Sequence, residues 1–192
     1  MRHLPHSARI ARPWKNGGGV TRDVFTAPEG AGLDSFDWRV SLAEVASDGP
    51  FSRFDGIDRT TAILSGAGFF LTVDGHPHRL TPDSPGLAYP GDAPASAVLI
   101  GGPVIDLNVM TRRARHSHSL RRVVLDQPAV FEAGTALVLW QAGRARVSNG
   151  ATPVMPDPLD ALVFDDAAHP ACWRVEPDGP IAFWLVRILP TR

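Results

Sequence analysis

Residues 63–75 read ILSGAGFFLTVDG, and residues 138–150 read VLWQAGRARVSNG. Each segment contains an apolar run, a glycine, a stretch in which apolar and other residues alternate, and a final Asp-Gly or Asn-Gly pair. The alternation is typical of a half-buried strand, and the final pair predicts a two-residue hairpin of type I′. Gly68 and Gly143 lie 75 positions apart, as do the two glycines that end the segments. The repeat predicts two β-domains of similar plan, although the short strands and turns of any all-β chain could echo one another by chance.

Short strands separated by turn residues are expected along the whole chain. Its 192 residues include 18 glycines and 18 prolines, which fall between apolar runs and mark turns. No long segment has the period of an amphipathic helix, and the one short helical candidate is residues 158–164. The strands expected are residues 36–43, 60–64, 68–73, 97–100, 105–111, 136–140, 144–147, 161–164, 172–175 and 181–188. This density of short strands favours a sandwich or a barrel.

The segment at residues 63–75 is followed by PGD at residues 90–92, and this order of motifs resembles a cupin barrel. The resemblance covers both halves of the chain and is clearer in the first. It implies an all-β bicupin, in which two antiparallel cupin-like β-barrels of the jelly-roll type lie in one compact chain. We expect the barrels to be residues 1–113 and 114–192, joined near residues 112–124.

The metal ligands of cupins are missing from this pattern. A metal-binding cupin carries His-x-His and, after four residues, Glu, and these places hold Ser52, Phe54 and Arg59. An arginine stays protonated and cannot ligate a divalent cation, but its guanidinium can hold a carboxylate through two parallel hydrogen bonds. The sequence therefore predicts no metal and no other cofactor, and Arg59 is the leading candidate for binding a small anionic ligand. In the alternative, Arg59 pairs at the surface with Asp55 or Asp58.

A glycine-rich segment near the N-terminus supplies further candidates for the ligand site. Trp14, Lys15 and Asn16 offer a stacking face, a cation and an amide, and three glycines follow them. Glycines let the backbone pass close to a ligand and point its N–H groups at an anion. We expect residues 15–19 to approach the mouth of the first barrel, and the alternative is a flexible loop that crosses it.

The last strand of the first half adds Asn108 and Met110 to the candidates. With Asp106 they share one face of the strand, and a face that is half polar suits the wall of a polar pocket. The alternative is an ordinary outward face. Arg39 lies opposite the apolar face of the strand at residues 36–43, and we expect it to face solvent or a second layer in a structural role.

Two His-x-His pairs are candidate metal ligands. His76 and His78 follow the first hairpin turn, and His116 and His118 lie in the arginine-rich stretch at residues 112–122. Neither pair has a carboxylate at ligand spacing, so we expect solvated surface histidines. The alternative for the arginine-rich stretch is a patch that binds an anion or a partner.

The bulk composition limits the classes of partner. The formal net charge is -1, which does not attract nucleic acid or an acidic membrane surface. The single cysteine, Cys172, cannot form an internal disulfide, and no apolar run has the length of a signal peptide or a transmembrane helix. We therefore expect a cytoplasmic protein with no nucleic-acid or membrane partner. A homodimer is compatible with the sequence, because bicupins often pair through exposed strands.

Five segments of the first half together resemble the HutD/Ves family. They are PWKNGGGVTR (13–22), FDWRVSLAEV (36–45), DGPFS (48–52), FDGIDR (54–59) and DLNVMTRR (106–113). Residues 114–192 match the family only in general plan. The resemblance implies a bicupin fold and a link to bacterial histidine utilisation, in which HutD-type proteins act as regulators that bind intermediates such as urocanate or formylglutamate. Ves-type relatives lie outside that pathway.

Two functions from different classes follow. The leading hypothesis is a metal-independent small-carboxylate-binding protein, a regulator or sensor linked to histidine utilisation, with urocanate, formylglutamate or formate as candidate ligands. The alternative is a metal-independent cupin enzyme, an isomerase or hydrolase that acts on a small carboxylate. An enzyme needs a poised base, yet the five segments contain no histidine and the only tyrosine is Tyr89. This favours binding and assigns no catalytic residue; a purely structural partner-binding module is a third hypothesis.

Overall fold

The computed structural model describes residues 1–14, 17–132, 134–164 and 172–191, and divides the chain into two units. One unit, here the 10–118 unit, comprises Ile10–His118 with Pro190–Arg192, and the other, here the 119–189 unit, comprises Ser119–Leu189 with Met1–Arg9. The division expected from the sequence, 1–113 and 114–192, differs at the N-terminus, because the first strand pairs with a strand of the 119–189 unit.

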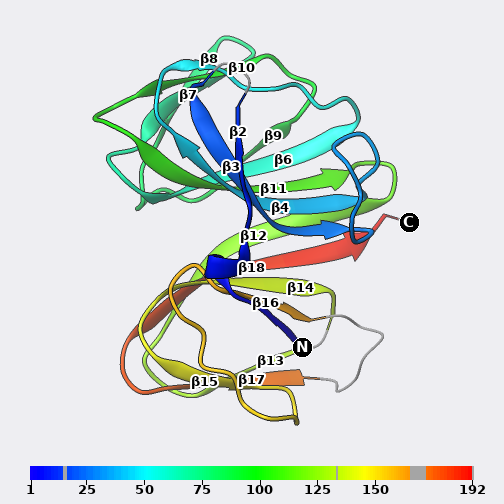
Figure 1. Cartoon of the computed structure of the whole chain (residues 1–192), viewed down its shortest axis with the longest axis vertical. Helices are drawn as coiled ribbons and strands as arrows, with labels where there is room; N and C mark the ends of the chain where they lie inside the picture. Colours follow the sequence, from blue (N-terminus) through cyan, green and yellow to red (C-terminus); the bar gives the residue numbers. More distant parts are fainter. Residues whose placement is uncertain (15–16, 133, 165–171, 192) are drawn as a thin grey trace. The chain divides into compact units, whose positions relative to one another are not determined.

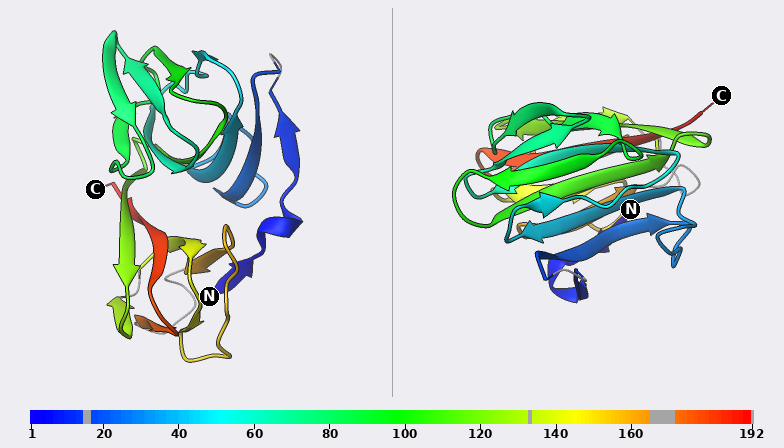
Figure 2. Two further views of the ribbon diagram at one scale, coloured as in Figure 1. Left: turned by 90° about the vertical axis from the view of Figure 1, so that its left-hand side faces the viewer. Right: turned by 90° about the horizontal axis from the view of Figure 1, so that it is seen from above.

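The 10–118 unit consists of two antiparallel sheets. The larger has the strand order β2-β3-β4-β11-β6-β9, and the smaller has the order β5-β10-β7-β8. The strands are β2 (Ala11–Pro13), β3 (Gly19–Ala27), β4 (Trp38–Val45), β11 (Val104–Arg112), β6 (Ile57–Ser65), β9 (Leu87–Pro90), β5 (Gly49–Pro50), β10 (Ala95–Leu99), β7 (Phe69–Val73) and β8 (His76–Leu80). The two sheets face each other (Figures 1 and 2), and buried Ile63, Phe69 and Leu71 belong to the apolar cluster between them.

The 119–189 unit repeats this plan with fewer strands. Its larger sheet has the order β1-β16-β14-β18-β12, and its smaller sheet has the order β13-β17-β15. The strands are β1 (Arg2–Leu4), β16 (Ala161–Phe164), β14 (Ala136–Ala142), β18 (Ile181–Pro190), β12 (His116–Leu125), β13 (Ala129–Glu132), β17 (Cys172–Pro177) and β15 (Ala145–Ser148). In the described part of the chain the one helical element is a 3-10 turn, η1 (His6–Ala8). The short helix considered at residues 158–164 is wrong, because its last four residues form strand β16.

The first of the two predicted hairpins is confirmed. Asp74 has a φ of 47° and Gly75 a φ of 80°, and Val73 pairs with His76 across the turn. Two successive residues with positive φ define the type I′ turn, which matches the twist of the strands it connects.

The second predicted hairpin is wrong in its register. Among the described non-glycine residues, positive φ occurs only at Asp74 and Leu159, so Asn149 does not form a type I′ turn. Instead Val147 and Val154 exchange backbone hydrogen bonds of 2.8 and 2.9 Å across a wider loop. This register places Val154 against the apolar cluster of the unit. A two-residue turn at Asn149 would change the register and lose this apolar contact.

Glycine packing shows how the two repeats align. A Cβ atom on Gly66 would lie 2.6 Å from the carbonyl oxygen of Pro103, and one on Gly143 would lie 2.4 Å from that of Pro180. These are equivalent close contacts, and both pairs of residues are offset by 77 positions. The 75-residue offset in the sequence pairs Gly143 with Gly68, but the structural equivalent of Gly143 is Gly66.

Candidate functional site

A cavity of about 560 Å³ lies within the 10–118 unit. Its walls come mainly from β3, β4, β6 and β11 of the larger sheet, from residues 12–14, and from four residues in and after β5, which are Pro50, Phe51, Ser52 and Phe54. Ser52, Phe54 and Arg59, which occupy the places of cupin metal ligands, all line it. The cavity thus lies where a metal cupin would hold its ion.

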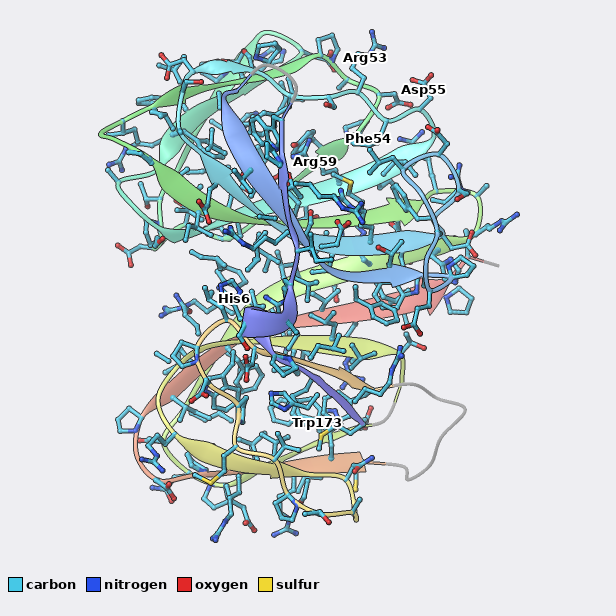
Figure 3. All side chains as sticks on the ribbon, viewed as in Figure 1. His6, Arg53, Phe54, Asp55, Arg59 and Trp173 are labelled. Atoms are coloured by element: carbon cyan, nitrogen blue, oxygen red, sulfur yellow. The ribbon has the colours of Figure 1, made fainter. Side chains whose placement is uncertain are left out.

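Arg59 extends from β6 into this region and is only 7% exposed (Figure 3). Its Nε and Nη2 atoms donate to the Oδ1 atom of Asn108 at 2.9 and 2.5 Å. The guanidinium carbon lies 4.8 Å from the ring centre of Phe51 and 5.5 Å from that of Tyr89. Two aromatic faces attract the cation without neutralising its charge.

The surface ion pair considered for Arg59 is not seen. Asp58 instead accepts from Arg113 at 2.8 Å, and Asp92 also lies near Arg113. No carboxylate in the described part of the chain lies within 4 Å of the Arg59 guanidinium. A buried guanidinium without an ion-pair partner can bind an anion.

Asn108 fixes the orientation of Arg59. On β11, Asn108 pairs in register with Thr61 of β6, and its Oδ1 atom also accepts from the Thr61 hydroxyl at 2.9 Å. The Nδ2 atom of Asn108 then donates to the Oδ1 atom of Asp106 at 2.5 Å. The amide therefore joins a cation on one side to a carboxyl group on the other.

Asp106 is the functional candidate that the sequence did not single out. It lines the cavity, has no exposed surface, and its Oδ2 atom has no hydrogen-bond partner among the described residues. Desolvation raises the pKa of Asp106 to about 7, although Arg59 and Asn108 act to lower it. The only sequence signal was its position on the same strand face as Asn108.

Arg39 also lies at the cavity, which corrects the expectation that it faces solvent or a second layer. It is 7% exposed, and its Nε atom donates to Asp23 of β3 at 2.7 Å. Asp23 in turn lies 3.2 Å from Arg12, so one carboxylate serves two guanidinium groups. The expectation failed because β4 is a central strand that is buried on both faces, so its polar face also points inward.

The remaining candidates are only partly described. Trp14 lines the cavity, and its Nε1 atom donates to Thr21 at 2.7 Å. Met110 lines it as well, whereas Lys15 and Asn16 lie outside the described residues.

Gly19, the first residue of β3, packs closely against neighbouring backbone. Its carbonyl accepts from the backbone N–H of Trp14 at 2.9 Å. A Cβ atom at this position would lie 2.3 Å from the carbonyl oxygen of Glu44. Glycine is therefore required here by close backbone passage.

The histidine pairs differ from each other. His76 and His78 are exposed on β8, as expected. His118 is partly buried and lies between two hydroxyl groups, 2.8 Å from Thr60 and 2.8 Å from Thr111, so the expectation of a solvated histidine is wrong for it. Burial lowers the pKa of His118.

Neither a metal cluster nor a membrane span is found in the described part of the chain. No group of three or more His, Cys, Asp or Glu side chains there could hold a metal ion. No helix among the same residues is long and apolar enough to cross a membrane.

The polar cavity is not repeated at the equivalent positions of the 119–189 unit. With the 77-residue offset, Arg59, Thr61, Asp106 and Asn108 correspond to Ala136, Val138, Phe183 and Leu185, all of which are buried in an apolar cluster. The ring of Phe183 stacks on Trp140 at 5.5 Å within this cluster. One interior is therefore polar where the other is filled with apolar side chains.

The architecture defines the class of protein. The chain is similar in structure to a cupin 2 conserved barrel domain protein from Leptotrichia buccalis, with a TM-score of 0.66, 10% identity, and coverage of 98% of this chain and 96% of that one. With two units of this plan, the fold is that of a bicupin.

Sequence comparison then gives the family. The sequence model of HutD matches residues 6–182, and the chain belongs to the HutD family. Protein Ves of Citrobacter koseri is 36% identical over 193 residues (92% of this chain, 89% of the relative), and an uncharacterised 21.2 kDa protein in the hutC 3′ region of Pseudomonas putida is 35% identical over 136 residues (71% of each). HutD from Pseudomonas fluorescens has a similar structure, with a TM-score of 0.83, 30% identity, and coverage of 100% of this chain and 99% of that one.

Proposed function

We propose that this chain binds a small carboxylate in the cavity of the 10–118 unit, without a metal, as a regulator or sensor linked to histidine utilisation. The proposal depends mainly on Arg59. Its guanidinium is buried and lines the cavity, and it has no ion-pair partner among the described carboxylates. A carboxylate ligand supplies the missing negative charge and fits the fork of the guanidinium.

The surroundings of Arg59 support an ionic ligand over a neutral one. Asn108 occupies the Nε and Nη2 donors, while Phe51 and Tyr89 hold the plane of the guanidinium. The group is thus oriented before a ligand arrives, which reduces the entropy lost on binding. We expect a cation held in this way to favour a carboxylate over its neutral amide.

The link to histidine utilisation rests on the family. One relative is named for its place in the hutC 3′ region, and the similar structure of HutD was determined in a formate condition. Urocanate, formylglutamate and formate are therefore the first ligands to test. We expect a cytoplasmic protein, since the single cysteine, Cys172, fits a reducing compartment.

A second candidate function is a metal-independent enzyme, an isomerase or hydrolase. The observation that favours it is Asp106, a buried carboxyl group at the cavity with a pKa of about 7. A carboxyl group with this pKa could serve as a general base or acid near neutral pH. Turnover of the bound compound would establish this function and show that the protein is not only a binding protein.

A ligand screen by thermal unfolding tests the proposal. Urocanate, formylglutamate and formate are each compared with a neutral amide, such as urocanamide or formamide. A ligand at a hundredfold excess over its Kd stabilises the folded state by about 2.7 kcal/mol, which raises the melting temperature by about 5–10 °C. We expect a shift with at least one carboxylate and none with its amide. Equal shifts, or no shift with any carboxylate, would show that the proposal is wrong.

A further inference from the structure

We propose that Asp106 is a second group that contacts the ligand, and that it takes up a proton when a carboxylate binds beside Arg59. The inference deepens the proposed function and rests on it.

The hydrogen bonds of Asp106 leave one oxygen available. The Oδ1 atom accepts from Asn108 at 2.5 Å, and the backbone of Ala43 also hydrogen-bonds the carboxyl group. The Oδ2 atom is buried and has no partner among the described residues, although Asp106 lines the cavity. A buried polar atom without a partner is costly, and a ligand in the cavity can supply that partner.

Among the described residues, the charged group that acts on Asp106 as a cation is Arg59. Arg59 of β6 is the charged group that favours ionisation of the Asp106 carboxyl. Tyr89 of β9 is neutral at neutral pH, and burial raises its pKa further. Across the cavity, Arg39 of β4 is paired with Asp23 of β3.

Arg12, a further described cation of the cavity wall, has little effect on the ionisation of Asp106. Arg12 of β2 also pairs with Asp23, and its side chain is 69% exposed. Among the described cations Arg59 is therefore the one that acts on Asp106, and desolvation outweighs it and raises the pKa of Asp106 to about 7.

A bound carboxylate changes this balance. It would place a second negative charge near Asp106 while competing for the same guanidinium, and like charges at close range cannot both persist in a desolvated site. Protonation of Asp106 removes the repulsion and converts its carboxyl group into an O–H donor for the ligand. The complex would therefore hold more protons than the free protein whenever free Asp106 is ionised.

Calorimetry of the wild-type protein measures this uptake directly. Formylglutamate and formate are the probes, because their carboxyl groups stay ionised near neutral pH, whereas the imidazole of urocanate titrates there. Binding heats are recorded at about pH 8 in two buffers with different heats of ionisation. We expect uptake of up to one proton per ligand, and a Kd that rises by up to about tenfold per pH unit above the pKa of free Asp106.

Two variants assign the proton to Asp106. Asp106→Asn offers an amide N–H in place of the protonated acid, so we expect it to bind both probes with no proton uptake and little pH dependence. Asp83→Asn changes an exposed carboxylate of the same unit and should behave as the wild type.

The outcomes separate this inference from the proposed function. Binding without proton uptake in the wild type would overturn the role of Asp106 and leave carboxylate binding intact. Proton uptake that persists in Asp106→Asn would also overturn it, because another group would then be responsible. If neither probe binds, this inference fails, whereas the proposed function fails only if urocanate also gives no shift in the thermal screen. The wild-type measurement decides the question even if Asp106→Asn does not fold.

Discussion

Arg59 places a permanent cation where a metal cupin has a ligand, and its neighbours make that burial tolerable. Asn108 accepts two of its N–H groups, and Phe51 and Tyr89 flank its plane. Cation–π contacts of this kind contribute up to about 2 kcal/mol when the cation is desolvated. None of these neighbours cancels the charge, so the site retains its attraction for an anion.

The pH dependence of stability should report the state of Asp106 in the free protein. The folded-state pKa of about 7 lies above the ordinary aspartate value of 3.8, so the folded protein binds more protons than the unfolded chain between these values. Stability contributed by protonated Asp106 is therefore full at low pH and is lost as the pH rises towards about 7.

Asp106→Asn removes this dependence. We expect the melting temperature of the variant, relative to the wild type, to increase by several degrees between about pH 5 and about pH 8. Asp83→Asn, at an exposed position, should show no such trend. A constant difference between Asp106→Asn and the wild type across this range would show that Asp106 has an ordinary pKa.

At the scale of strands, alternation and turn chemistry predicted most of the elements. The strand expected at residues 161–164 is β16, and the Asp-Gly hairpin forms as expected. The strands without a predicted range are β1, β2, β3, β5, β8, β9, β12 and β13. The two long ones, β3 and β12, carry many polar side chains, which hide the alternation that marks a strand. Such strands form because neighbouring strands satisfy their backbone groups, which is a tertiary effect.

The candidate site was predictable in part. The cupin motif order placed Arg59, and strand alternation placed Asn108 and Met110, all of which line the cavity. The roles of Arg39 and Asp106 were not predictable, because each depends on which faces of a central strand are covered. Burial on both faces, and the resulting pKa of about 7 for Asp106, appear only when the sheets are assembled.

Two glycines of one hairpin region test the close packing of strand ends. A Cβ atom on Gly68, where φ is 97°, would lie 2.0 Å from the carbonyl oxygen of Leu80, whereas one on Gly75, where φ is 80°, would meet nothing within 4 Å. We expect Gly75→Ala to cost about 1 kcal/mol from backbone strain alone, and Gly68→Ala to cost about 2–4 kcal/mol because overpacking is added. Denaturant unfolding measures both, and equal costs would contradict this account.

At the scale of the whole molecule, two units of one plan both have an apolar cluster, and they differ at the positions that line the cavity. The 10–118 unit places Arg59, Asp106 and Asn108 around a cavity, whereas equivalent positions of the 119–189 unit hold residues such as Phe183 and Leu185 in an apolar cluster. Apolar side chains that fill an interior stabilise it, and they leave no donor or acceptor for an anion.

This difference predicts one carboxylate site per chain. Calorimetric titration with a binding carboxylate should give a stoichiometry of about one, with a single class of site. A stoichiometry of two would mean that the 119–189 unit also binds, and that its apolar interior does not exclude the ligand.

The affinity of Arg59→Lys for a carboxylate is the most direct test of the central claim. Lysine keeps the charge but loses the planar fork and its paired hydrogen bonds. Loss of a charge-assisted hydrogen bond costs about 1.5–3 kcal/mol, so we expect the Kd measured by calorimetry to rise by about tenfold or more. Arg79→Lys, an exposed change on β8, should leave the Kd unchanged. If Arg59→Lys binds the carboxylate as tightly as the wild type, Arg59 does not hold the ligand and the site lies elsewhere.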